Sequence, residues 1–135
     1  MTDGTVNHIG IATLSLDKSE ELWSKLGFSP SVDQINQEQG VKIRYMEGMG
    51  RTRIELLEPI GAESPVGRFI ESNGPGVQQI AVNVADIKST ISELTEIGVR
   101  MVSDDPIIGS EGHRIAFVHP SSAGGVLIEL VESSK

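Results

Sequence analysis

The sequence predicts an α+β fold in which two tandem β-α-β-β-β units form a cupped mixed sheet. The prediction rests on internal repetition, because residues 6–12 align with residues 77–83, and residues 54–58 align with residues 128–132. All four are short runs rich in apolar residues, which is typical of buried strands. Self-similarity at a fixed spacing is the signature of a duplicated unit, so we expect two copies of one half-domain.

An amphipathic helix is expected after the first strand of each copy. Asp17 and Asp86 are the expected N-caps, since an aspartate side chain accepts hydrogen bonds from the free N–H groups of a first helical turn. Each helix is expected to end at a glycine, Gly27 or Gly98, because glycine readily takes the left-handed conformation that closes a helix. Apolar residues recur at helical spacing between these ends, so one face of each helix should lie on the sheet.

The other strands follow these helices in both copies. They are expected at residues 41–46 and 53–57, and again at residues 114–119 and 126–131. The offset between equivalent residues grows from 71 in the first strands to 74 in the last ones, so the second copy carries three extra residues, which we place at 109–112.

The chain is expected to fold as one domain, because its 135 residues lie within the usual size of a single domain. We divide that domain into repeat one at about 5–60, a connector at about 61–75 and repeat two at about 76–133. Neither repeat is large enough to bury its own sheet, so the two copies must pack together. The connector is expected to contain a short helix at residues 65–70.

Composition excludes several classes of function. A formal net charge of −8, with no long basic run, argues against nucleic-acid binding, since a phosphate backbone would be repelled. No apolar stretch reaches the roughly 20 residues of a membrane span, and no signal peptide is visible, so we expect a cytoplasmic protein without membrane contact. Without cysteine there are no disulfides or thiolate ligands, and any metal must be held by nitrogen and oxygen.

The densest group of basic residues could help an anionic small ligand to bind in spite of this negative charge. The group consists of Lys42, Arg44, Arg51 and Arg53. The competing interpretation is a solvated strand face, which is the usual place of such residues.

Four polar residues that can bind metals stand inside otherwise apolar strands, where burying a charge without a partner is costly. His8 and Gln79 lie in the first strand of each repeat, and Glu55 and Glu129 lie in the last. Each of them alone could simply face solvent, as most strand glutamates do. Because both repeats carry the same pattern, we expect pseudo-twofold symmetry to bring the four side chains together.

One imidazole, one amide oxygen and two carboxylates, without sulfur, suit a divalent ion such as Co²⁺, Mn²⁺, Ni²⁺, Zn²⁺ or Mg²⁺. Four protein ligands leave two positions of an octahedron for a bidentate oxygen ligand. An ion held in this way acts as a Lewis acid that polarises a carbonyl and stabilises an enediolate.

Duplicated β-α-β-β-β units with this ligand pattern resemble the vicinal oxygen chelate (glyoxalase/bleomycin resistance/dioxygenase) superfamily, and within it the methylmalonyl-CoA epimerases. The resemblance extends over nearly the whole chain. The motifs that carry it are residues 8–12 (His-Ile-Gly-Ile-Ala), 38–41 (Glu-Gln-Gly-Val), 54–59 (Ile-Glu-Leu-Leu-Glu-Pro), 114–120 (Arg-Ile-Ala-Phe-Val-His-Pro) and 124–130 (Gly-Gly-Val-Leu-Ile-Glu-Leu). The second and the last of these motifs distinguish the epimerases from the glyoxalases.

The resemblance implies a metal-dependent epimerase that interconverts (R)- and (S)-methylmalonyl-CoA. Such an enzyme abstracts the proton alpha to the thioester and forms a metal-stabilised enolate. Carried over by position, His8, Glu55, Gln79 and Glu129 are the metal ligands, and Glu129 is also the catalytic carboxylate. The resemblance further implies an acyl-CoA substrate and a homodimer.

The chain departs from the family pattern at two positions. The family usually has histidine where this chain has Gln79, a weaker neutral ligand that makes a harder ion more acceptable. Some members carry a further catalytic glutamate where this chain has Ile43, which leaves the second proton-transfer group unassigned. A glyoxalase-type lyase or isomerase and a ligand-binding protein with a degraded metal site therefore remain alternatives. An extradiol dioxygenase is disfavoured, because its iron site prefers two histidines and one carboxylate.

The two other histidines are not expected in the site. His119 precedes a proline at the end of a strand, where a histidine more often closes a turn than binds a ligand. His113 is expected to be exposed.

Overall fold

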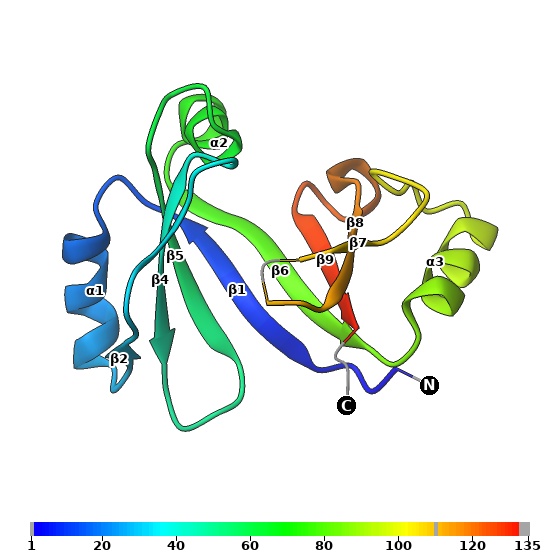
Figure 1. Ribbon diagram of the computed structural model, residues 1–135, viewed down its shortest axis with the longest axis horizontal. Coiled ribbons are helices and arrows are strands. Elements are labelled where there is room, and N and C mark those ends of the chain that lie inside the picture. Colours follow the sequence, from blue (N-terminus) through cyan, green and yellow to red (C-terminus); the bar gives the residue numbers. More distant parts are fainter. Residues whose placement is uncertain (1, 110, 133–135) are drawn as a thin grey trace. The chain divides into compact units, whose positions relative to one another are not determined.

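The computed structural model describes residues 2–109 and 111–132 (Figure 1). Over these residues it contains nine strands and three α-helices, which confirms the mixed α+β class. Internal contacts divide the described chain into two compact units. The first unit consists of residues 8–78, and the second consists of residues 2–7 together with residues 79–132. The organisation as a single domain stays a prediction.

The first unit contains a mixed sheet and two helices. Its elements are β1 (Val6–Ala12, from His8 onward), α1 (Leu16–Lys25), β2 (Ser29–Pro30), β3 (Gln34–Asn36), β4 (Val41–Glu47), β5 (Arg53–Pro59) and α2 (Pro65–Asn73). The strand order is β2-β4-β5-β1, and β3 also pairs with β4. β1 and β5 are parallel, whereas β4 runs antiparallel to β2, β3 and β5. The long strands and the connector helix confirm the sequence prediction; β2 and β3 are too short to show a strand pattern.

The second unit repeats this plan with fewer strands. Its elements are β6 (Gly76–Val84, from Gln79 onward), α3 (Ile87–Glu96), β7 (Ile107–Ile108), β8 (Arg114–Val118), a 3₁₀ turn (Pro120–Ser122) and β9 (Leu127–Glu132). The strand order is β6-β9-β8-β7, with β6 parallel to β9 and the remaining pairs antiparallel. A first strand parallel to the last strand, with a helix between them, is therefore common to both units.

The helix ends agree with the prediction except at one cap. The N-cap of α1 is Ser15, whose side chain accepts a hydrogen bond from Lys18 N at 3.2 Å, while Asp17 lies within the first turn. The prediction of Asp17 as N-cap was wrong, because serine caps a helix as well as aspartate does and stands two residues earlier. Asp86 caps α3 as predicted. No helix in the described parts of the chain is long and apolar enough to cross a membrane.

A carboxylate from the last strand binds the start of the helix in each unit. Glu58 Oε1 on β5 accepts a hydrogen bond from Leu16 N at 2.9 Å. Glu132 Oε2 on β9 accepts one from Ile87 N at 2.8 Å. A negative charge is favourable at a helix N-terminus, where backbone N–H groups lack partners within the helix. Each helix is therefore tied to a fixed position along its last strand.

Alternating side chains of the strands build separate apolar cores. In the first unit, one core packs against α1 and contains Leu16, Met46, Ile54 and Leu56, with Ile9, Ile11, Trp23 and Phe28 at its edge. The other packs against α2 and contains Ala12, Val41, Ile43, Tyr45, Leu57 and Val66. In the second unit, α3 covers a core of Val84, Ile87, Ile91, Ala116, Val118 and Leu130. Successive residues of a strand point to opposite faces, so these cores define which face each polar residue shares.

The strand register corrects the position of the extra residues in the second copy. Tyr45 pairs with Glu55 across β4 and β5, and Phe117 pairs with Glu129 across β8 and β9. The residue numbers of equivalent positions therefore differ by 72 between β4 and β8, and by 74 between β5 and β9. One extra residue precedes β8, and two lie between β8 and β9, next to the 3₁₀ turn. The placement of all three at 109–112 was wrong; Ser110 lies outside the described residues.

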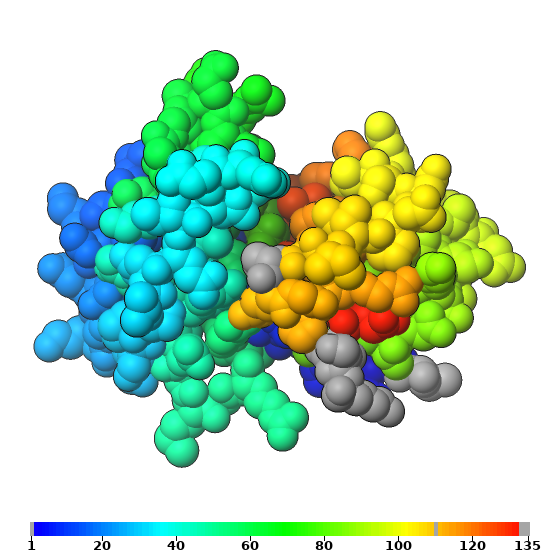
Figure 2. All heavy atoms as spheres, in the orientation of Figure 1, coloured from blue at the N-terminus to red at the C-terminus, as the bar shows by residue number. Residues whose placement is uncertain are grey.

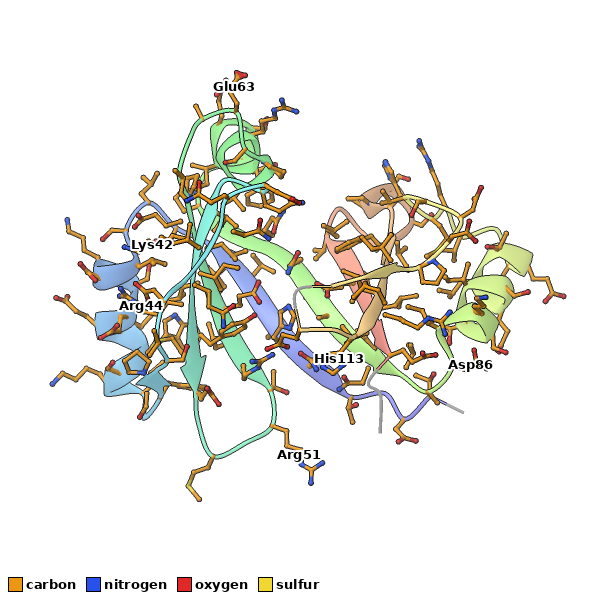
Figure 3. The ribbon with its side chains drawn as sticks, viewed as in Figure 1. Lys42, Arg44, Arg51, Glu63, Asp86 and His113 are labelled. Carbon is orange, nitrogen blue, oxygen red and sulfur yellow. The ribbon has the colours of Figure 1, made fainter. Side chains whose placement is uncertain are left out.

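Arg44 on β4 links the sheet of the first unit to α1 and to the loop before β3. Its Nε and Nη2 donate to the two carboxylate oxygens of Asp33 at 2.6 and 2.8 Å. Its Nη1 donates to Asp17 at 2.9 Å and to Glu20 at 3.0 Å. The hydrogen bonds and charge of Arg44, with Lys42 nearby at 3.8 Å, lower the pKa of Asp33. Figure 3 shows Lys42 and Arg44 on the side of β4 that faces α1.

Asp33→Asn should destabilise the protein by about 1–2 kcal/mol at neutral pH, because a bidentate charge-assisted hydrogen bond is lost. The carboxylate of Asp33 has a lowered pKa in the folded state, so its contribution is complete above about pH 4 and is lost as the pH falls through the folded value. The stability difference between wild type and variant should therefore shrink below pH 4 in urea unfolding experiments.

The exposed loop residue Asp104 provides a matched control, and Asp104→Asn should leave stability nearly unchanged at every pH. A deficit of Asp33→Asn that stays constant from pH 7 down to pH 2 would contradict this account of the Arg44 network.

Candidate functional site

The polar residues of the first unit form a buried pair. His8 Nε2 on β1 lies 3.5 Å from Glu55 Oε2 on β5. Both residues are 6% exposed, so neither faces solvent. The parallel register of the two strands places His8 beside Arg53 and Gly10 beside Glu55. The side chains of His8 and Glu55 thus meet diagonally, on one face of the sheet.

The polar residues of the second unit form an equivalent pair. Gln79 Nε2 on β6 donates a hydrogen bond to Glu129 Oε1 on β9 at 3.4 Å. Both residues are half-buried, and Ala81 is the direct neighbour of Glu129 across the parallel strands. A half-turn of the amide would exchange Nε2 for Oε1 and present an oxygen ligand in the same place. Each unit therefore brings its own two predicted ligand residues together. A site formed by all four residues stays a prediction.

Each glutamate stands between a very small residue and an aromatic one. Gly10 and Tyr45 are the neighbours of Glu55 on the two adjacent strands. In the second unit, Ala81 and Phe117 are the corresponding neighbours of Glu129. The small residue leaves room beside the carboxylate, and the aromatic ring supplies an apolar wall on its other side.

The four residues of the basic group named in the sequence analysis do not form one patch. Lys42 and Arg44 lie on the α1 side of β4 and bind Asp33. Arg51 lies in the exposed loop between β4 and β5, as Figure 3 shows. This loop projects from the surface at the lower edge of Figure 2. Arg53 is different, because its residue parity on β5 places it on the same face as Glu55.

Arg53 packs on an aromatic ring beside the His8–Glu55 pair. Its Cζ lies 4.2 Å from the ring centroid of Tyr45, in the range of a cation–π contact. Sequence reasoning did not single out Tyr45. Arg53 lies two residues from Glu55, so strand alternation alone places both on one face. Tyr45 lies on another strand, and only the pairing of β4 with β5 shows that it shares this face.

The other histidines lie outside these pairs. His119 Nδ1 accepts a hydrogen bond from Ser121 N at 3.0 Å, which confirms that His119 closes a turn. His113 was predicted to be exposed, but it is half-buried, and its Nδ1 has no hydrogen-bond partner among the described residues. Its carbonyl accepts a hydrogen bond from Gly109 N at 2.8 Å, just before β8.

The donor atoms fit a divalent ion of borderline or hard character. Within either unit, the described residues hold no cluster of three or more His, Cys, Asp and Glu side chains. The first unit supplies an imidazole and a carboxylate, and the second supplies an amide and a carboxylate. Proteins usually bind such ions with three or more ligands, so neither pair is a complete site on its own.

Comparisons with known proteins agree on one family. Residues 7–117 match the Glyoxalase/Bleomycin resistance protein/Dioxygenase superfamily. The chain is 37% identical over 131 residues to the mitochondrial methylmalonyl-CoA epimerase of Dictyostelium discoideum, covering 96% of this chain and 78% of that protein.

Solved structures give the same result. The methylmalonyl-CoA epimerase from Mycobacterium tuberculosis superposes with a TM-score of 0.86 and 36% identity, covering 99% of this chain and 90% of that one. A Streptomyces coelicolor methylmalonyl-CoA epimerase in complex with 2-nitronate-propionyl-CoA superposes with a TM-score of 0.82 and 37% identity, covering 96% of this chain and 94% of that one.

Proposed function

This chain belongs to the glyoxalase/bleomycin resistance protein/dioxygenase superfamily and, within it, to the methylmalonyl-CoA epimerases, and on that premise we propose that it epimerises methylmalonyl-CoA. The observation that carries the proposal is the repeated pair: a glutamate on the last strand lies beside a ligand-type side chain on the first strand in both units. A glutamate repeated in this way is more than a solvated strand residue, because Glu55 is buried and Glu129 half-buried.

Epimerisation at the carbon alpha to a thioester requires removal of a proton from one face and return of a proton to the other. The thioester carbonyl makes this proton acidic, because the negative charge left behind spreads onto the carbonyl oxygen. We assign to Glu129 a share in the proton transfer, at one face of the α-carbon, because it combines partial exposure with an apolar wall formed by Phe117. The group that acts at the other face is unassigned. A carboxylate in such a place can reach a substrate and can act as a general base.

We assign the metal ligands to His8, Glu55, Gln79 and Glu129, acting on one ion. One nitrogen and three oxygen ligands suit Co²⁺, Mn²⁺, Ni²⁺, Zn²⁺ or Mg²⁺, and neither pair alone offers enough ligands. A divalent ion bound there would supply Lewis-acid stabilisation of the charge that develops on the substrate oxygens. His8 and Glu55, being buried and in contact, are the more rigidly held half of this set.

The acyl-CoA substrate follows from the same proposal. A homodimeric state is proposed from the family resemblance alone, and location in the cytoplasm is proposed from the sequence features given above. The alternative function is that of a ligand-binding protein with a weakened metal site. It is favoured by one observation, the amide of Gln79 in hydrogen-bond contact with Glu129. The two proposed functions differ in whether the protein exchanges the α-proton of methylmalonyl-CoA.

With Co²⁺ or Mn²⁺ in D₂O, the wild-type protein should exchange the α-proton of methylmalonyl-CoA for deuterium. Glu129→Gln should lower the exchange rate about 100-fold or more, because the base is lost and a metal ligand is weakened while the shape is kept. Glu93→Gln is the matched control and should leave the exchange rate unchanged, since Glu93 is an exposed residue of α3. NMR or mass spectrometry would follow the exchange, and wild-type exchange no faster than that of Glu129→Gln would refute the epimerase proposal.

Gln79→His should bind Co²⁺ about tenfold or more tightly than the wild type, because imidazole is a stronger ligand than an amide oxygen for this ion. Titration calorimetry or the cobalt absorption spectrum would measure the affinity. The neighbouring Gln78→His places the same side chain on the opposite face of β6 and should leave the affinity unchanged. If Gln79→His also leaves it unchanged, Gln79 is not a ligand.

A further inference from the structure

The two units differ in chemistry at the positions next to their glutamates. Tyr45 pairs with Glu55 across β4 and β5, and Phe117 pairs with Glu129 across β8 and β9. Arg53 pairs with His8, and the residue that pairs with Gln79 in the same parallel register is Leu127. At equivalent positions, the first unit thus carries a phenol and a guanidinium, and the second carries a phenyl ring and an isobutyl group.

Tyr45 and Arg53 form one structural element. The guanidinium carbon of Arg53 lies 4.2 Å from the centroid of the Tyr45 ring. The ring is rigidly held, because Tyr45 is 5% exposed and is part of the core under α2. A guanidinium stacked on a fixed ring keeps its donor edge in one plane, which suits recognition of a planar anion.

The position of Arg53 singles it out among the basic residues. The strands β1, β4 and β5 turn His8, Tyr45 and Glu55 toward one face of the sheet. Among the Lys and Arg residues of these three strands, Arg53 is the one that lies on that face. Lys42 lies on the other face. A chain with a formal net charge of −8 gives a long-range field that repels anions, so a local cation is needed wherever an anionic group binds.

We propose that Arg53, positioned by Tyr45, binds the free carboxylate of the acyl group and thereby selects dicarboxylic acyl-CoA thioesters over monocarboxylic ones. This inference rests on the proposed function, because it places the acyl group of the substrate beside the His8–Glu55 pair. A guanidinium donates two parallel hydrogen bonds to a carboxylate, a geometry that a lysine does not reproduce.

The phosphates of CoA are the other anionic groups that Arg53 could contact. They are separated from the thioester by the long pantetheine arm, whereas Arg53 is the register partner of His8 and lies two residues from Glu55. Because Arg53 lies beside His8 and Glu55, which the proposal places at the acyl end of the substrate, we expect it to contact the acyl carboxylate and not the phosphates.

The test measures dissociation constants of malonyl-CoA, acetyl-CoA and CoA by titration calorimetry, with Mn²⁺ present throughout. Malonyl-CoA and acetyl-CoA differ in the carboxylate, and CoA reports contacts to the phosphates and the pantetheine arm. Wild type should prefer malonyl-CoA over acetyl-CoA, and Arg53→Leu, which installs the residue of the second unit, should lower that preference about tenfold or more. Binding of acetyl-CoA and CoA should stay the same.

Two further variants separate charge from geometry. Arg53→Lys should restore part of the preference, because it keeps the charge and loses the planar donor edge. Tyr45→Phe should keep most of it, because the ring remains. Thermal melting checks that each variant is folded, and Arg53→Gln replaces Arg53→Leu if the latter does not fold.

The inference is overturned if wild type binds malonyl-CoA and acetyl-CoA equally, or if Arg53→Leu keeps the wild-type preference. It is also overturned if Arg53→Leu weakens all three ligands alike, since Arg53 would then contact the CoA moiety. Failure of the proposed function is distinguishable, because it appears as absent α-proton exchange in a wild-type protein that still prefers malonyl-CoA.

Discussion

The register of the last strand in each unit determines where the polar groups of the candidate site lie. β5 turns Glu55 toward one face and Glu58 toward the other, where Glu58 accepts a hydrogen bond from the first turn of α1. β9 does the same with Glu129 and Glu132. A slip of one residue would exchange the two faces, so the helix cap and the site glutamate must be correct together. The bond between a carboxylate and a helix N-terminus thus holds the register on which the site depends.

Much of the fold could be predicted because apolar periodicity and repetition are both local signals. The strand bounds around His8 and Glu55, and the glycines that end the helices, follow from such signals. The N-cap of α1 did not, since Ser15 and Asp17 are equally good caps and only the path of the chain decides between them. The two extra residues after β8 escaped prediction because register, and not composition, locates them.

The candidate site was predictable to a similar degree. Duplication makes His8 equivalent to Gln79 and Glu55 equivalent to Glu129, which singled out these four residues, and the structure shows one contact within each unit. The roles of Tyr45 and Arg53 could not be read from sequence, because they depend on which residues face each other across separate strands. The basic group that could have helped an anionic ligand to bind is divided: Lys42 and Arg44 lie on one face of the sheet, Arg53 lies on the other, and Arg51 lies in a loop.

The proposed site divides its work unequally between the repeats. The first unit offers imidazole, guanidinium and phenol groups around a buried carboxylate, while the second surrounds Glu129 with an amide, Ala81 and Phe117. In the proposal, His8 and Glu55 help to bind the ion and Arg53 binds the acyl carboxylate, while Glu129 is both a ligand and a proton-transfer group. The central claim is that both pairs ligate a single divalent ion. Binding of Mn²⁺ measured by electron paramagnetic resonance tests it directly. We predict one tight site per chain that is lost in Glu55→Ala and equally lost in Glu129→Ala, because alanine has no ligand atom. A tight site that survives either substitution would contradict the claim.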